Sequence, residues 1–206
     1  MSQIRQKVGV FGGAFDPPHH AHVALAQAAI TALALDTLHV IPTGQAWHKS
    51  RALSSAPDRL AMTRLAFQNM PRVVVDDREI KRAGPTYTID TLLALQAETP
   101  DAQFYLALGA DQFAAFKHWH RWQEILQIAI ICIAKRPCKD WVADQYDTFP
   151  ELRDRVLTLQ MPPMAVSATQ IRQLLAGGLG ENHAMADLLP NPVARYIAQH
   201  RLYQAP

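Results

Sequence analysis

Two spacings of apolar residues alternate along the chain. Short apolar runs rich in β-branched residues predict strands, and apolar residues three or four positions apart predict the helices between them. The expected strands cover residues 8–11, 37–41, 73–75, 104–108, part of 125–134, and 156–160. Because strands and helices alternate throughout, the pattern predicts an α/β fold with a doubly wound, mostly parallel sheet.

The expected helices have recognisable ends. They run from His20 to about Leu35, from Pro57 onward, over residues 89–96, from Ser167 to Gly177, and over residues 192–203. Ser167 and Gln170 form a capping-box pattern, and Thr86 or Thr88 is the expected N-cap of the helix over 89–96. No repeat or linker interrupts the pattern, so we expect a single domain over residues 1–206, with a helical C-terminal part from about 163 to 206.

The segment after the first strand combines glycine with histidine. Gly12 and Gly13 predict a turn at which the backbone passes close to a ligand, and a helix follows from about His20. Unpaired N–H groups and the positive dipole end at a helix start favour an anion. His19 and His22 are three residues apart and therefore share one face of this helix start. The arrangement is typical of phosphate binding.

Composition narrows the class of protein. The 206 residues carry a formal charge of only +2, which argues against a nucleic-acid partner but allows local basic pockets for phosphorylated ligands. Cys132 and Cys138 resemble neither a disulfide framework nor a metal-ligand set. The densest apolar run, residues 128–134, is much shorter than a membrane span. We expect a soluble cytoplasmic protein with no membrane partner.

Several chemistries compete for the histidines. Asp16, His19, His20 and His22 are metal-ligand types, but no further acidic or cysteine cluster completes a site, so we expect no resident metal. The histidines could also be purely structural residues with backbone partners. Nucleophile-elbow, P-loop and dinucleotide fingerprints are absent from the sequence. What remains is phosphoryl chemistry by positioning, with imidazoles and an arginine as donors.

Two motifs resemble a known family. Gly12-Gly13-x-Phe15-Asp16-Pro17-x-His19-x-x-His22 resembles the His-x-Gly-His signature of the nucleotidyltransferase superfamily, and Ser167-Ala168-Thr169-x-Ile171-Arg172 resembles its second signature. The stretch 86–92, Gly109-Ala110-Asp111 with Phe116 and Trp119, and the 192–203 ending are similar to bacterial nicotinate-nucleotide adenylyltransferases. The resemblance implies a Rossmann-like fold and transfer of the adenylyl group of ATP to nicotinate mononucleotide, forming deamido-NAD and pyrophosphate. Mg²⁺ would enter on the ATP phosphates.

The resemblance also implies a role for each matching residue. His19, His22 and Arg172 would act on the ATP phosphates, with His22 at the α-phosphate. The ATP-binding residues would be Gly12, Gly13, Phe15, Ser167, Thr169 and Ile171. The acceptor would meet Tyr87, Thr88, Asp111, Trp119 and His120, with the Trp119 ring stacked on the pyridine. Secondary phosphate contacts would come from His48, Lys49 and Arg136.

This chain departs from the family pattern at two positions. Ala21 stands where the signature usually has glycine, and His120 stands where tyrosine is frequent. Two rival functions stay open: transfer to another phosphorylated acceptor, such as pantetheine phosphate or a cytidylyltransferase substrate, and a non-catalytic nucleotide sensor. The expected assembly is a monomer or a small homo-oligomer.

Overall fold

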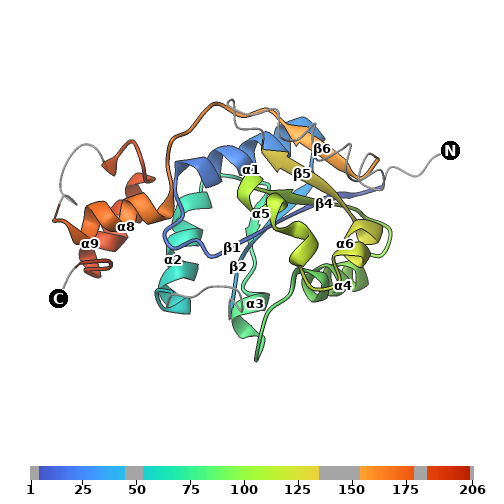
Figure 1. The fold of residues 1–206 in the computed structure, drawn as a ribbon, viewed down its shortest axis with the longest axis horizontal. Helices are drawn as coiled ribbons and strands as arrows, with labels where there is room; N and C mark the ends of the chain where they lie inside the picture. Colours follow the sequence, from blue (N-terminus) through green and yellow to red (C-terminus); the bar gives the residue numbers. More distant parts are fainter. Residues whose placement is uncertain (1–4, 45–52, 135–153, 179–184, 205–206) are drawn as a thin grey trace.

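Six parallel strands form the centre of the fold (Figure 1). The computed structural model describes residues 5–44, 53–134, 154–178 and 185–204. The strands are β1 (Lys7–Gly13), β2 (Thr37–Pro42), β3 (Val73–Val75), β4 (Gln103–Leu108), β5 (Ala129–Ala134) and β6 (Val156–Leu159). Their order in the sheet is β3-β2-β1-β4-β5-β6, which confirms the expected doubly wound sheet and makes it parallel throughout the described residues.

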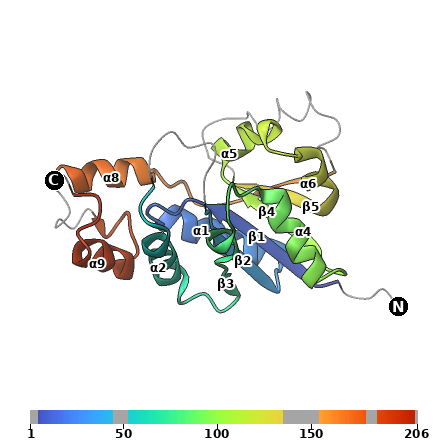
Figure 2. The ribbon, with the colours of Figure 1, turned by 90° about the horizontal axis from the view of Figure 1, so that it is seen from below.

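Helices cover both faces of the sheet (Figures 1 and 2). They are α1 (His20–Leu33), α2 (Ala56–Phe67), α3 (Arg78–Lys81), α4 (Thr88–Glu98), α5 (Ala110–Ala114), the 3₁₀ helix η1 (Phe116–His118), α6 (Trp122–Ile128), α8 (Ala168–Ala176) and α9 (Asn191–Gln199). One apolar core lies between the sheet and α4, η1 and α6, and a second lies between the sheet and α1. No helix among the described residues has the length and apolar character needed to cross a membrane.

Strand alternation builds these two cores. Phe104, Leu106 and Leu108 of β4 face the first core, whereas Tyr105 and Ala107 face the second. Successive side chains of a strand point to opposite faces, so a strand covered on both sides is apolar at nearly every position. This is why the strands appear in the sequence as short continuous apolar runs.

The order of the strands places a crevice between β1 and β4. The chain moves outward from β1 through β2 to β3, then returns to β4 and moves outward the other way. At such a reversal the connections after the two central strands diverge, leaving space above their carboxyl ends. β1 ends at Gly13 and β4 ends at Leu108, and each end leads into a motif quoted above: the His19 and His22 motif after β1, and Gly109-Ala110-Asp111 after β4.

The C-terminal helices pack beside α2, at the end of the molecule opposite the N-terminus (Figure 2). Ile171 and Leu175 of α8, with Val193 and Ile197 of α9, share a core with Met62 of α2. A hydrogen bond of 2.9 Å from the Tyr196 hydroxyl to Asp58 adds to this contact.

Several sequence expectations are wrong in detail. Gly12 and Gly13 are the last residues of β1 rather than a turn, and α1 ends at Leu33 because Ala34 adopts a left-handed conformation. The first part of 125–134 belongs to α6, and the short helix α3 follows β3. Neither Thr86 nor Thr88 caps α4, whose N-cap is Tyr87 without a side-chain hydrogen bond. The Ser167 cap of α8 is confirmed by its 3.2 Å bond from the Gln170 N–H.

Candidate active site

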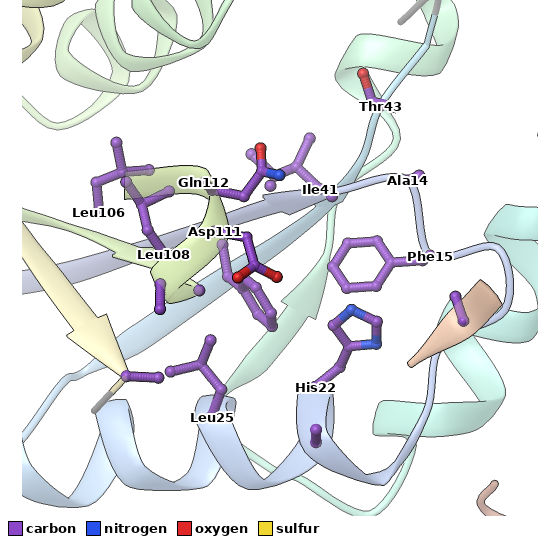
Figure 3. A pocket seen from close by; sticks show the side chains of 18 of the residues that line it. Ala14, Phe15, His22, Leu25, Ile41, Thr43, Leu106, Leu108, Asp111 and Gln112 are labelled. Atoms are coloured by element: carbon purple, nitrogen blue, oxygen red, sulfur yellow. The ribbon is translucent and has the colours of Figure 1, made fainter. Parts of the chain in front are cut away.

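A cavity of about 710 Å³ opens above the carboxyl ends of β1, β2 and β4 (Figure 3). Its wall also includes the starts of α1, α4, α5 and α8. Figure 3 shows His22 reaching from α1 toward the ring of Phe15, with Asp111 on another side of the space. This volume is in the range of small-molecule sites, and the cavity lies at the crevice that the strand order predicts.

The two glycines of β1 differ in what surrounds them. A Cβ added at Gly12 would meet no atom within 4 Å, so this backbone faces open space in the cavity. A Cβ at Gly13 would lie 3.2 Å from the Phe15 ring. Gly13 therefore makes room for Phe15, whereas Gly12 leaves room for a ligand to approach the backbone.

The His19 and His22 rings stack with their centroids 3.7 Å apart. The backbone N–H of His19 donates to Nδ1 of His22 at 3.1 Å. A ring nitrogen that accepts carries no proton, so a neutral His22 has its proton on Nε2. The fold therefore fixes His22 in the tautomer that can donate from Nε2, and the ring lines the cavity.

His19 is more deeply buried than His22. Burial and the nearby His20 lower the pKa of His19 from 6.5 to about 4, so the ring is neutral near pH 7. Its Nδ1 is buried and has no hydrogen-bond partner among the described residues. Both imidazoles line the same cavity, as their spacing in the sequence predicts.

Arg172 of α8 joins this cavity from the far end of the chain. One guanidinium nitrogen donates to the backbone carbonyl of Asp16 at 2.7 Å, and another donates to the hydroxyl of Thr169 at 3.0 Å. Arg172, Thr169 and Ser167 all line the cavity with His22. The two sequence signatures therefore meet at one site, although about 150 residues separate Arg172 from His22.

Aromatic side chains form another part of the cavity wall. The Trp119 ring packs against buried Phe116 at 5.6 Å between centroids, and the Tyr87 ring lies 4.5 Å from that of His120. Trp119, Tyr87 and His120 line the cavity together with Thr88 and Asp111. A flat ring, a hydroxyl and a carboxylate suit an aromatic ligand that carries a sugar.

A buried polar cluster under this wall was not foreseen from the sequence. The carboxylate of Glu79, only 7% exposed, accepts from the Thr91 hydroxyl at 2.8 Å, and the hydroxyls of Thr43 and Thr86 lie 3.0 Å apart. Burial raises the pKa of Glu79, while hydrogen bonds from the threonines act in the opposite direction. The cluster ties the end of β2 to the segment before α4.

A second unforeseen group is buried Arg59 of α2. Its guanidinium donates to the carbonyl oxygens of Ala14 at 3.0 Å, Thr43 at 2.7 Å and Ser54 at 3.1 Å. An arginine in an amphipathic helix usually indicates a solvent-exposed face, so no sequence pattern points to this role.

The structure leaves four predicted site residues away from the cavity or undescribed. The side chain of Ile171 is fully buried in the C-terminal core and does not line the cavity, and the role of this residue in ATP binding stays a prediction. His48, Lys49 and Arg136 lie outside the described residues.

Cys132 is buried, and its burial raises the thiol pKa to about 12.

The part of the chain that the structure describes contains no group of three or more His, Cys, Asp or Glu side chains that could hold a metal ion. Donors, by contrast, are frequent: imidazole, guanidinium, hydroxyl and backbone N–H groups surround the cavity. This donor set fits phosphate oxygens.

A family profile and several known proteins are similar to most of this chain. A profile of the cytidylyltransferase-like family matches residues 10–174. A probable nicotinate-nucleotide adenylyltransferase of Albidiferax ferrireducens is 54% identical over 97% of this chain and 98% of its own length, and one of Herpetosiphon aurantiacus is 42% identical over 97% and 100%. The solved nicotinic acid mononucleotide adenylyltransferase of Plasmodium falciparum in complex with NaAD covers 97% of this chain and 98% of its own, with a TM-score of 0.75 at 18% identity.

Proposed function

This chain belongs to the cytidylyltransferase-like family and, within it, to the nicotinate-nucleotide adenylyltransferases, and we propose that it joins ATP to nicotinate mononucleotide. The products are deamido-NAD and pyrophosphate, in the biosynthesis of NAD. The observation that carries the proposal is the meeting of His22 and Arg172 in one cavity, which supplies phosphate donors from two segments far apart in the sequence.

The reaction is an in-line displacement at phosphorus. A phosphate oxygen of nicotinate mononucleotide attacks the α-phosphorus of ATP, and the bond from that phosphorus to the bridging oxygen of the β-phosphate breaks. Pyrophosphate leaves with the electron pair of that bond. Little covalent chemistry falls to the protein, so alignment of the reactants and stabilisation of the growing negative charge supply the acceleration.

The ATP half of the site would use the two signatures. His22 would donate from Nε2 to an α-phosphate oxygen, in the tautomer that the His19 N–H fixes. Gly12 would let the triphosphate approach the backbone, because no protein atom fills the space at its missing Cβ. Arg172, Thr169 and Ser167 would hold the phosphates from the opposite side, and His19 would contact them as a neutral ring.

The acceptor half would use the aromatic wall. Trp119 would stack on the pyridine ring, and Thr88 with the backbone near His120 would meet the nicotinate carboxylate. Asp111 would help to fix the nucleotide, and Tyr87 would support His120 through their ring contact. Mg²⁺ would arrive as part of the substrate, bound to the ATP phosphates. A single domain over residues 1–206, a cytoplasmic location and a monomer or small homo-oligomer stay predictions of the sequence.

The test is a comparison of acceptors. The protein is incubated with Mg·ATP and either nicotinate mononucleotide, nicotinamide mononucleotide or pantetheine phosphate, and pyrophosphate release is followed. We expect the fastest release with the nicotinate nucleotide. Turnover with pantetheine phosphate alone would refute the acceptor assignment.

A variant separates an enzyme from a nucleotide sensor. Removing a donor that acts in the transition state lowers kcat by about 100- to 1,000-fold, so His22→Ala is expected to lose that much turnover with a smaller loss of ATP affinity. Equal and small losses in both quantities would favour a structural histidine.

A further inference from the structure

The C-terminal tail reaches the loop that follows β1. The hydroxyl of Tyr203 donates to a carboxylate oxygen of Asp16 at 2.6 Å, and 187 positions separate the two residues. Asp16 is only 2% exposed, and the backbone N–H of Ser54 lies 3.4 Å from its other carboxylate oxygen. Burial, with the adjacent Asp16 carboxylate, raises the pKa of Tyr203 above its usual value, so the hydroxyl keeps its proton near neutral pH.

The loop that Tyr203 contacts has a backbone conformation that needs outside support. Phe15 has a φ of +46°, in the left-handed region that a bulky side chain rarely adopts. Its buried ring packs against Phe11, His22 and Phe67, and the carbonyls on either side of it accept hydrogen bonds from other elements. Arg59 donates to the Ala14 carbonyl and Arg172 to the Asp16 carbonyl.

Asp16 therefore connects the C-terminal tail to Arg172, which lines the cavity. Its carbonyl oxygen holds the Arg172 guanidinium, while its side chain is held by Tyr203. A shift of Asp16 would move the acceptor of the Arg172 bond. Phe15 would move with it, and its ring lies 5.1 Å from that of His22.

From these contacts we propose that Tyr203 is a positioning residue of the ATP half-site, holding Asp16 so that Arg172 and His22 keep their orientation toward the phosphates. The inference rests on the proposed function, because it assumes that these donors bind ATP. Tyr203 itself does not line the cavity and acts through the loop.

The chain offers a matched control for the loss of one tyrosine hydroxyl. Tyr196 also belongs to the C-terminal part and also donates to an aspartate, Asp58, at 2.9 Å. Neither Tyr196 nor Asp58 lines the cavity. Tyr196→Phe thus removes a similar bond between the C-terminal part and α2 without touching the loop after β1.

The experiment compares Tyr203→Phe with Tyr196→Phe. Binding of a non-hydrolysable ATP analogue is measured by calorimetry, the KM of each substrate by pyrophosphate release, and Tm by thermal unfolding. A hydrogen bond to a charged group corresponds to roughly a tenfold change in an equilibrium constant. We expect the Kd of the analogue to rise about tenfold in Tyr203→Phe and less than twofold in Tyr196→Phe, with the KM for nicotinate mononucleotide unchanged in both.

A double variant tests whether Tyr203 acts through Arg172. Residues coupled through one network show non-additive effects. In an Arg172→Lys background, Tyr203→Phe is expected to raise the Kd of the ATP analogue by less than about threefold. A full tenfold effect in that background would show that the two residues act separately and would overturn the proposal.

The other outcomes are equally decisive. An analogue affinity in Tyr203→Phe equal to that in Tyr196→Phe, or a parallel weakening of both substrates, would reduce Tyr203 to a stabilising residue. If Tyr203→Phe does not fold, Asp16→Asn keeps an oxygen acceptor but weakens the bond. It is expected to bind the analogue about threefold more weakly, and unchanged binding would overturn the proposal. Failure of the unmodified protein to bind the analogue would instead refute the proposed function.

Discussion

Replacing Arg59 by methionine tests how much of the stability depends on one buried cation. Arg59 is 2% exposed, and three of its hydrogen bonds to backbone carbonyls, those to Ala14, Thr43 and Ser54, are 3.1 Å or shorter. A fourth, to Gly44, is longer at 3.4 Å. Methionine keeps most of the side-chain length and removes every donor, so these carbonyls lose their partner without a large cavity forming.

The size of the loss in folding stability follows from the three backbone carbonyl oxygens that are left without a donor. A buried polar group without a partner costs about 1–3 kcal/mol. Methionine also removes the unfavourable burial of a guanidinium, so we take about 1 kcal/mol for each of the three shorter bonds. The expected loss is about 3 kcal/mol, a large part of the roughly 5–15 kcal/mol by which a native protein is stable.

Urea unfolding followed by tryptophan fluorescence measures this loss. With a slope of about 3 kcal/mol per molar urea, the midpoint is expected to fall by about 1 M. Arg72→Met is the control, because Arg72 is exposed and donates a hydrogen bond of 3.0 Å to the Leu35 carbonyl. Its midpoint is expected to fall by less than about 0.3 M. Equal shifts in the two variants would refute the idea that Arg59 holds the segments around the site together.

Two further predictions concern glycine and pH. Gly12→Ala is expected to leave Tm unchanged, because its Cβ meets no protein atom, and to raise the KM for ATP, because this Cβ would occupy space left for the ligand. Gly44→Ala is expected to lower Tm, because its Cβ would overlap the Glu79 carbonyl oxygen. Although burial acts to raise it, hydrogen bonds from His39 and Arg78 hold the pKa of Asp76 well below its unfolded value of 3.8. A carboxyl group whose pKa is lower in the folded protein stabilises the fold above its unfolded pKa. This stabilisation is lost as the pH falls from the unfolded pKa toward the folded pKa. In urea titrations, the advantage of the unmodified protein over Asp76→Asn is therefore expected at pH 7 and to shrink below about pH 4.

The sheet could be predicted because its signals are local. Each central strand is covered on both faces, so it appears as an apolar run, and the helix starts carry cap residues such as Ser55 and Ser167. The signal failed where two elements are equally apolar. Residues 125–128 finish α6 and residues 129–134 form β5, and no change in hydrophobicity marks the boundary.

The candidate site could be predicted in part for a topological reason. Once the sheet is parallel, the segments after β1 and β4 must meet above the strand ends, which brings the His19 and His22 face close to Asp111. The helix that carries Arg172 also follows a strand end, that of β6, and the resemblance of its motif to a family signature gave Arg172 its role. The structure supplies the physical contact, a bond from Arg172 to the Asp16 carbonyl.

The buried polar residues could not be predicted from any pattern. Glu79, Arg59 and Tyr203 find their partners through tertiary packing, over separations that reach 187 residues for the Tyr203 bond. A buried charge or hydroxyl is stable only where its partners are already in place. In the sequence, Arg59 resembles an ordinary surface residue of a helix, and Glu79 resembles a surface residue of the charged stretch that ends a strand.

Two of these hidden residues, Arg59 and Tyr203, share a target with Arg172, the loop between β1 and α1. A reaction that proceeds by positioning needs its phosphate donors held to within about 0.5 Å, and the left-handed Phe15 means that this loop does not favour its conformation unaided. Rigidity therefore has to come from other elements: Arg59 of α2, Arg172 of α8 and Tyr203 of the tail each bond to a loop atom. Each of those bonds weakens if the loop shifts. Substitutions at Arg59 or Tyr203, which do not line the cavity, are therefore expected to weaken the binding of the ATP phosphates.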